Sequence, residues 1–223
     1  MKKTVCFSLW GDNDKYTVGA IKNADLAESL YPGWVCRFYV GQSVPKNIVD
    51  SLSKKENTEI ILMDEEGDWT GMFWRFAAAS DPDVSVMLSR DTDSRISKRE
   101  VAAVDEWLAS EKSFHIMRDH PGHSTNIMGG MWGVRYPKLK NIEDLSGGFQ
   151  KGDFWQVDQH FLKDVIYPLV CEDSFVHDEY HSFDAHAKPF PTQRGPETLP
   201  EDPSVFLDYV GKSLLADDSL CWE

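Results

Sequence analysis

The chain has 223 residues, with 23 Lys and Arg against 37 Asp and Glu, and a formal net charge of -14 at pH 7. This acidic balance excludes non-specific attraction to nucleic acid or to an anionic membrane, so a phosphate-bearing ligand would need a local binding site. No apolar run approaches the length of a membrane-spanning helix, the N-terminal apolar stretch is too short for a signal peptide, and the cysteines lie far apart without a CxxC pair. We therefore expect a soluble cytoplasmic protein with no membrane insertion, nucleic-acid partner or zinc site.

The first third of the chain alternates between strand and helix patterns. These patterns cover Thr4–Leu9, Val18–Leu30, Trp34–Val40, Pro45–Ser53 and Thr58–Met63. Such alternation predicts right-handed crossovers and a largely parallel sheet. No linker-like stretch divides the sequence, so we expect a single α/β domain over residues 1–223.

A further strand pattern begins at Val84 and ends in two carboxylates, Asp91 and Asp93. Side chains in this position point beyond the carboxyl edge of a sheet, where α/β folds bind their ligands. Clustered carboxylates suit a hard divalent cation, Mg²⁺ or Mn²⁺, which keeps coordination sites for substrate phosphates. An acidic surface turn is the alternative interpretation. Just upstream, a short predicted helix, Met72–Ala79, carries Arg75, which would pair with phosphate or sugar oxygens or with a neighbouring carboxylate.

Helix and strand patterns also follow the acidic pair. Ser97 and Glu100 match a capping box that starts a helix reaching Leu108. A predicted strand, Phe114–Met117, then leads into a polar loop that contains Asp119.

The second half of the chain contains glycines, one strong helix pattern and a long irregular segment. Another group must approach the backbone closely at Gly129-Gly130-Met131-Trp132-Gly133, and a sugar ring is one candidate. The best late helix pattern covers Gly152–Tyr167, and Asp158 interrupts its apolar face. We predict that residues 176–223, which lack periodicity, form a loop-rich C-terminal segment over the active site, mobile up to Arg194 until a ligand binds.

The chain carries several short motifs in a fixed order. They are Phe7-Ser8-Leu9-Trp10-Gly11-Asp12 with Lys15-Tyr16, Tyr31-Pro32-Gly33-Trp34, Ser89-Arg90-Asp91-Thr92-Asp93-Ser94-Arg95, Gly129-Gly130-Met131-Trp132-Gly133, Asp158-Gln159 and Pro189-Phe190-Pro191-Thr192. Together they resemble the small GT-A glycosyltransferases encoded by large algal viruses, phages and some bacteria, including the N-terminal glycosyltransferase domain of a chlorella virus protein. The resemblance covers Val5 to Arg194 and implies a Rossmann-like GT-A domain with a central, mostly parallel mixed sheet flanked by helices.

This resemblance implies a metal-dependent hexosyl- or deoxyhexosyltransferase that moves a sugar from a nucleotide sugar to an acceptor hydroxyl of a glycan. The donor would most often be a UDP-sugar, the metal Mn²⁺ or Mg²⁺, and a viral enzyme would act in the host cytoplasm. Carried over onto this sequence, the pattern makes Asp91 and Asp93 the metal-binding pair at the donor, with Asp93 as the direct ligand. The nucleotide base would meet the backbone of the first motif and an aromatic ring, at Phe7, Ser8, Leu9 and Tyr16.

The resemblance also assigns ligand-binding groups late in the chain. Enzymes of this kind often use a histidine near the C-terminus as a further metal ligand. His177 is the first choice here, and His181 and His186 are the alternatives. Lys188 resembles a lysine that contacts the diphosphate. For each of these residues, an ordinary solvated side chain is the competing interpretation.

An acceptor hydroxyl needs a base if the reaction inverts the configuration of the sugar. Asp158 is the first candidate, because it interrupts an apolar helix and because the Asp158-Gln159 pair resembles the reaction-centre pair of related enzymes. Asp119 is the second candidate. In a retaining reaction neither would act as a simple base. The metal would neutralise the charge that develops on the leaving diphosphate.

Two other classes of protein are compatible with the residues alone. A strand followed by Asp-Thr-Asp also begins the phosphatases of the haloacid dehalogenase type, where the first Asp is the nucleophile, although that motif normally lies near the start of a chain. A non-catalytic carbohydrate-binding module would use Trp and Phe rings as a stacking surface. Most of these aromatic residues lie within periodic runs, which is typical of a core.

Overall fold

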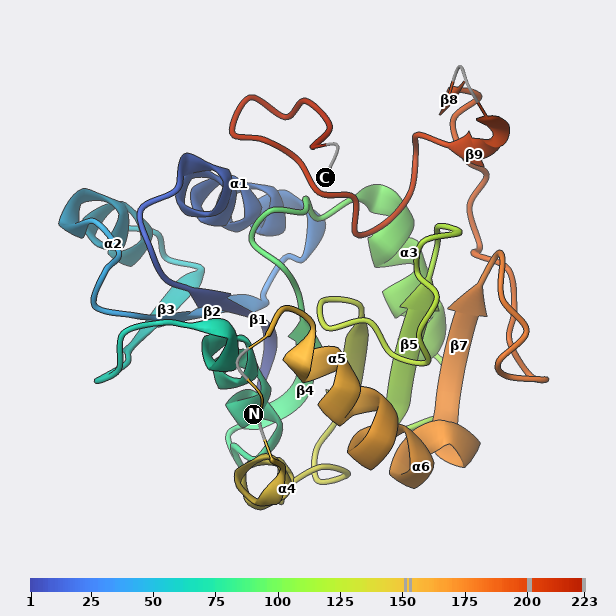
Figure 1. The fold of residues 1–223 in the computed structure, drawn as a ribbon, viewed down its shortest axis with the longest axis horizontal. Helices are drawn as coiled ribbons and strands as arrows, with labels where there is room; N and C mark the ends of the chain where they lie inside the picture. Colours follow the sequence, from blue (N-terminus) through green and yellow to red (C-terminus); the bar gives the residue numbers. More distant parts are fainter. Residues whose placement is uncertain (151, 153, 200–201, 222–223) are drawn as a thin grey trace.

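One mixed sheet organises the chain in the computed structural model, which describes residues 1–150, 152, 154–199 and 202–221 (Figure 1). The strand order is β3-β2-β1-β4-β6-β5-β7, where β6 is antiparallel to both neighbours and the other pairs are parallel. The strands are β1 (Lys2–Leu9), β2 (Val35–Val40), β3 (Thr58–Leu62), β4 (Val84–Ser89), β5 (Phe114–Arg118), β6 (Trp132–Arg135) and β7 (Ser174–Asp178). The predicted α/β class with a mostly parallel mixed sheet is therefore confirmed.

Helices cover both faces of the sheet, and each face has its own apolar core. One face carries α1 (Asp14–Leu30), α2 (Lys46–Ser53) and α3 (Lys98–Leu108); the other carries the 3₁₀ helix η1 (Trp69–Ala79) with α4 (Ile142–Gly148), α5 (Val157–Phe161) and α6 (Tyr167–Val170). Along β1, Phe7 and Leu9 pack in the first core and Cys6 packs in the second. Because both faces are filled, a ligand site is expected at an edge of the sheet.

The predicted start of α3 is confirmed, and it ties this helix to the acidic strand. The Ser97 hydroxyl accepts a hydrogen bond from the Glu100 N–H at 3.2 Å. The Glu100 carboxylate accepts from Arg90 at 2.8 Å and from the Tyr31 hydroxyl at 3.0 Å. Since Arg90 follows β4 directly, this buried pair fixes α3 against the end of the strand that precedes the acidic pair.

The late helix begins later than its pattern predicts. Gln156 has a left-handed φ of 72°, so the helix that carries Asp158 starts at Val157 as α5. It continues through a π-helical turn, η2 (Leu162–Ile166), into α6, and a short 3₁₀ turn, η3 (Cys171–Asp173), precedes β7. Residue 153 of the predicted helix lies outside the described residues.

Two short strands of the structure, β6 and β7, were not predicted from the sequence. In β6, a Cβ at Gly133 would lie 2.7 Å from the Leu88 side chain, so glycine here permits close pairing with β4 rather than a ligand contact. In β7, the polar residues His177 and Asp178 concealed the strand. Both are buried, and Asp178 accepts from Arg118 of β5 at 2.6 Å.

The segment expected to be irregular from residue 176 therefore begins inside β7. After it, the described chain contains a small hairpin of β8 (Thr198–Leu199) and β9 (Asp202–Phe206). Residues 200, 201, 222 and 223 lie outside the described residues. Figure 1 shows the last part of the chain crossing the carboxyl edge of the sheet between α3 and α1. Within the described residues, every helix is too short or too polar to span a membrane.

Candidate active site

The carboxyl ends of β1 and β4 lie side by side at the centre of the sheet. The strands pair in parallel with Cys6 opposite Ser89, and the Arg90 N–H donates to the Cys6 carbonyl at 3.0 Å. The strand order runs outward in opposite directions from this pair. Ligands of open α/β sheets bind in the crevice at such a point. The first sequence motif and the acidic pair therefore meet where a ligand is expected.

Arg75 of η1 joins two carboxylates of the predicted site. Its guanidinium forms a short ion pair with Asp91 and donates to an Asp158 oxygen at 3.0 Å and to the Arg90 carbonyl at 2.9 Å. The side chain of Arg75 is only 4% exposed, whereas that of Asp91 is 44% exposed. The Arg75 backbone N–H donates to the Ser8 hydroxyl at 3.1 Å. Arg75 thus pairs with neighbouring carboxylates, which is one of the two roles that the sequence analysis gave it. Asp91 is the exposed end of this cluster.

Asp158 is the buried end of the same cluster. Burial raises the pKa of the Asp158 carboxyl, and the neighbouring Arg75 opposes that rise. The second carboxylate oxygen accepts the Gln159 N–H at 2.9 Å. A carboxyl group whose pKa is moved towards neutrality by burial is suited to proton transfer.

The glycine-rich stretch makes room for these carboxylates. A Cβ at Gly129 would collide with the Asp158 carboxylate, and a Cβ at Gly130 would collide with that of Asp91. The Ser89 hydroxyl donates to the Gly129 carbonyl at 2.7 Å and fixes the stretch against β4. The groups that approach this backbone closely are therefore the protein's own carboxylates rather than the sugar ring considered from the sequence.

Asp93 is held by residues from α1 and from the end of the chain. The Lys15 ammonium lies 3.3 Å from Oδ2, and the Ser213 hydroxyl donates to the same oxygen at 2.8 Å. Burial raises the pKa of Asp93, and the neighbouring Asp91 charge adds to the rise. A carboxylate whose pKa is raised by burial and by a neighbouring carboxylate is stabilised by a divalent cation.

Helix α1 positions the acidic turn through residues that the sequence analysis missed. A Cβ at Gly19 would collide with the Thr92 carbonyl oxygen, so this contact requires glycine. Asn23, buried one helical turn later, donates to the Ser94 carbonyl at 2.8 Å and accepts from the Ile96 N–H at 3.0 Å. One signal in the sequence could have indicated this contact. Asn23 is a polar residue one turn after Gly19, on a helix face that is otherwise lined by small apolar residues.

The predicted binding site for the nucleotide base combines the buried end of β1 with one exposed aromatic ring. The Phe7 ring is buried and stacks on Phe38 with ring centres 4.9 Å apart, and Leu9 is also buried. Only the backbone of these two residues can therefore face a ligand. The Tyr16 ring is 37% exposed, and the Lys15 ammonium lies 5.3 Å from its centre. An exposed ring beside the acidic turn is compatible with stacking on a base, which stays a prediction.

His177 and Lys188 lie at the far edge of the sheet. The His177 Nε2 atom is 3.1 Å from the Glu106 carboxylate, and the Lys188 ammonium is 3.8 Å from the same residue. Strands β6 and β5 separate β7 from β4, a distance of about 14 Å at the usual spacing of strands. The structure therefore corrects the expectation that these two residues join the acidic pair. The alternatives, His181 and His186, follow the same edge strand.

Asp119 is enclosed by the protein. Its carboxylate is fully buried and accepts from Arg99 at 2.8 and 2.9 Å, from Arg194 and from the Val210 N–H at 2.8 Å. Two guanidinium groups and a backbone N–H hold this carboxylate after β5, which β6 separates from the strand that leads to the acidic pair, so the structure argues against Asp119 as the base.

The acidic pair fits a hard divalent metal. The second oxygens, Asp91 Oδ2 and Asp93 Oδ1, accept no hydrogen bond from any described residue. No cluster of three or more His, Cys, Asp or Glu side chains suited to a metal occurs in the described part of the chain. A cation here would complete its coordination with water and a substrate diphosphate, as Mg²⁺ commonly does.

Comparison with known proteins supports the fold. No protein-family model and no curated protein matches the chain. Among solved structures, a glycosyltransferase involved in the glycosylation of the major capsid of PBCV-1 matches with a TM-score of 0.53 and 17% identity, over 80% of this chain and 82% of that chain.

Structures solved with a nucleotide sugar or a nucleotide match in the same way. The mannosyltransferase PcManGT from Pyrobaculum calidifontis, in complex with GDP-Man and Mn²⁺, has a TM-score of 0.55 and 13% identity over 80% of this chain and 55% of its own. Glucosyl-3-phosphoglycerate synthase from Mycobacterium tuberculosis, with Mn²⁺, UDP and its product, has a TM-score of 0.52 and 12% identity over 86% and 72%. At these identities the likeness concerns the fold. The chain therefore has the fold of the GT-A glycosyltransferases, as its motifs predicted.

Proposed function

We propose that this protein is a metal-dependent glycosyltransferase that moves a sugar from a UDP-sugar to a hydroxyl group of a saccharide acceptor. The observation that carries the proposal is the acidic pair, Asp91 and Asp93, in the crevice between β1 and β4 of a chain with this fold. Proteins that share the fold have been solved with Mn²⁺ and either GDP-Man or UDP.

The donor would bind along the first motif and the acidic turn. Asp91 and Asp93 would hold Mn²⁺ or Mg²⁺, and the Tyr16 ring would stack on the base. The metal supplies Lewis-acid stabilisation of the negative charge on the leaving diphosphate. Lys15, whose ammonium lies 3.3 Å from Asp93, would place a second cation beside that diphosphate.

The acceptor would be activated by Asp158 if the transfer inverts configuration. Arg75 bridges Asp158 and Asp91, so the base and the metal ligand lie on either side of one guanidinium group. The acceptor hydroxyl gives its proton to the Asp158 carboxylate while its oxygen bonds to the anomeric carbon, and the bond from that carbon to the diphosphate breaks. Burial raises the pKa of Asp158, which favours this proton transfer.

Two observations count against the alternatives. In a phosphatase of the haloacid dehalogenase type, Asp91 would be the nucleophile, but that motif normally lies near the start of a chain, and here it follows the fourth strand, β4. In a carbohydrate-binding module, aromatic rings would form a surface, but four of the tryptophans lie in the interior: Trp34, Trp74, Trp107 and Trp132.

The proposal is tested by release of UDP from a panel of UDP-sugars, with and without saccharide acceptors, in Mn²⁺ and again in excess EDTA. We expect UDP release that requires the metal and increases with one acceptor class. Release of inorganic phosphate in place of UDP, or binding of saccharides without turnover of any donor, would favour one of the alternatives.

A further inference from the structure

The end of the described chain lies on Asp93. The Ser213 hydroxyl donates to Asp93 Oδ2 at 2.8 Å, and the Leu214 N–H donates to the Asp93 carbonyl at 2.8 Å. Two consecutive residues therefore hold the side chain and the main chain of one aspartate that is 120 positions away in the sequence.

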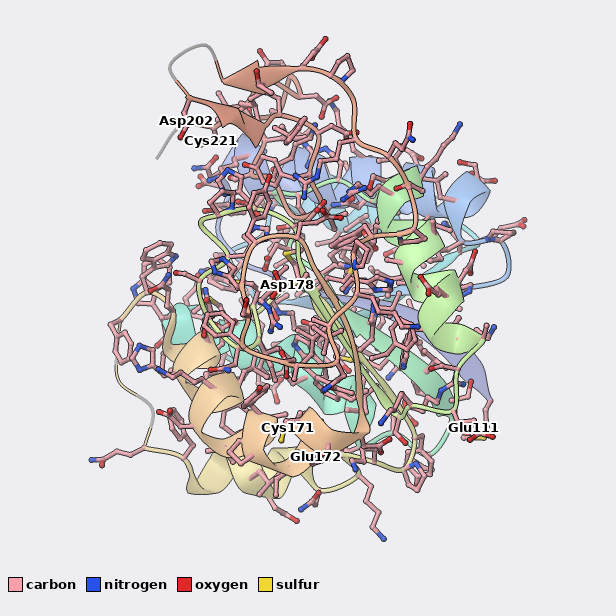
Figure 2. All side chains as sticks on the ribbon, turned by 90° about the vertical axis from the view of Figure 1, so that its right-hand side faces the viewer. Glu111, Cys171, Glu172, Asp178, Asp202 and Cys221 are labelled. Carbon is pink, nitrogen blue, oxygen red and sulfur yellow. The ribbon has the colours of Figure 1, made fainter. Side chains whose placement is uncertain are left out.

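This segment, residues 210–221, is called the C-terminal strap below, and it is fastened on both sides of Asp93. Before the contact, the buried Val210 donates its N–H to the Asp119 carboxylate at 2.8 Å. After it, the Asp218 carboxylate accepts from Lys22 at 2.5 Å and from Arg95 at 2.9 Å. Figure 1 shows the strap crossing the sheet edge, and Figure 2 labels Cys221 near its end.

The strap is also ordered within itself. The Cys221 N–H donates to the Ser213 carbonyl at 3.0 Å, and the Leu215 N–H donates to the Ser219 carbonyl at 2.9 Å. Leu214 is 5% exposed. The two hydrogen bonds hold the main chain at Ser213 without involving Asp93.

A hydroxyl on one oxygen of a carboxylate restricts its rotation and decides which oxygen is left for another ligand. Ser213 and Lys15 both lie on Oδ2 of Asp93, which leaves Oδ1 outside any hydrogen bond from the described residues. Partners that orient a metal ligand in this way contribute strongly to metal affinity.

We propose that Ser213 is a positioning residue for Asp93, and that the C-terminal strap completes the donor site by presenting Asp93 Oδ1 to the metal. This inference rests on the proposed function, because it takes Asp93 to be the metal ligand there. It adds a residue from a part of the chain that the sequence motifs do not reach.

The test is the affinity for Mn²⁺, measured by calorimetry on the full chain in saturating UDP. We expect Ser213→Ala to weaken Mn²⁺ binding by about 10- to 100-fold, and Ser213→Thr to restore most of the loss because it keeps the hydroxyl. Ser219→Ala is the matched control, since its hydroxyl lies in the same strap but donates to Asp217 at 2.6 Å. That control should bind Mn²⁺ as the wild type does, and both alanine variants should have the same melting temperature.

A second pair of variants tests the strap as a whole. Asp218→Asn weakens the attachment to Lys22 and Arg95 and should lower Mn²⁺ affinity by a smaller factor than Ser213→Ala. Asp217→Asn, one residue earlier, should have no effect. Equal Mn²⁺ affinity in wild type, Ser213→Ala and Asp218→Asn would overturn the inference alone, whereas failure of the wild type to bind Mn²⁺ with UDP would overturn the proposed function.

Discussion

Two clusters of charged side chains lie at the carboxyl edge of the sheet, and they differ in how fully their carboxylates are paired. The open cluster, beyond β1 and β4, consists of Arg75, Asp91, Asp93 and Asp158. The closed cluster, beyond β5 and β7, consists of Arg99, Arg118, Arg194, Asp119, Asp178 and Asp184. In the closed cluster the Asp119 and Asp178 side chains are 0% exposed, whereas Asp91 in the open cluster is 44% exposed.

The difference shows that acidic residues at a sheet edge do not by themselves identify a ligand site. Arg118 donates to Asp178 at 2.6 Å and pairs closely with Asp184, and the Tyr167 hydroxyl donates to Asp184 at 2.7 Å. Such buried pairs hold loops to the sheet, and breaking one is costly because a charge is left without a partner. In the open cluster Asp158 is also paired, but Asp91 Oδ2 and Asp93 Oδ1 accept no hydrogen bond from a described residue, and we infer that ligand binding belongs there.

The largest effect is expected from Asp93→Asn. If the open cluster binds the metal, this change removes a direct metal ligand. Loss of a group that only orients such a ligand costs up to about 100-fold, so we expect sugar transfer to fall by more than about 100-fold. The melting temperature should be little changed. Asp83→Asn, an exposed acid at the other end of the same strand, is the control and should behave as wild type. Normal turnover in a folded Asp93→Asn protein would place the metal site elsewhere.

Asp158→Asn separates the base from the metal ligands within the open cluster. We expect transfer to fall by about 10²- to 10⁴-fold, the usual contribution of a positioned base, with affinity for UDP and Mn²⁺ close to that of wild type. Rates and melting temperatures should be measured on one preparation. A drop in melting temperature, with activity that follows the folded fraction, would instead assign Asp158 to the support of Arg75.

Arg118→Met should break the closed cluster without affecting the site. It leaves the buried Asp178 and Asp184 carboxylates without their guanidinium, so the free energy of unfolding should fall by about 3–5 kcal/mol. UDP affinity of the folded fraction should be unchanged, as measured by denaturant titration and calorimetry. A selective loss of UDP affinity at full stability would contradict the distinction between the clusters.

A smaller effect concerns pH and the histidine beside the closed cluster. Burial lowers the pKa of His123 to about 3, and its Nδ1 accepts the Asp119 N–H at 3.0 Å. Between pH of about 6.5 and the folded pKa, the unfolded chain binds a proton that the folded chain does not, so stability falls as pH falls, by about 1.4 kcal/mol per pH unit.

His123→Asn keeps an acceptor for the Asp119 N–H and removes the titration. The variant should therefore show a shallower loss of unfolding free energy than wild type on going from neutral to acidic pH, measured by denaturant titration at several pH values. Parallel pH profiles for the two proteins would contradict a neutral buried His123.

The parts of the site that could be predicted from the sequence have local signals. The acidic pair follows a buried strand, and Asp158 interrupts an apolar helix face, so both are visible within a short window. Arg75 lies in a predicted helix, although its guanidinium bridges carboxylates of the protein itself. The α/β sheet was predictable because strand and helix patterns alternate along the first third of the chain.

The parts that could not be predicted depend on contacts between distant segments. Asn23 and Ser213 reach residues 71 and 120 positions away, and neither pairing has a signature in the sequence around it. His177 was assigned to the metal from the order of motifs, which does not show that β7 pairs with β5 at the edge of the sheet. Motif order thus identified the fold, while strand order decides which residues meet.

The most direct measurement is a calorimetric titration of UDP into the wild-type protein and into Asp93→Asn, each with and without Mn²⁺. We expect the wild type to bind UDP much more tightly with Mn²⁺ than without it, and we expect this difference to disappear in Asp93→Asn. UDP binding that is equally tight without Mn²⁺, or that keeps its full Mn²⁺ dependence in Asp93→Asn, would contradict a metal-dependent donor site at the open cluster.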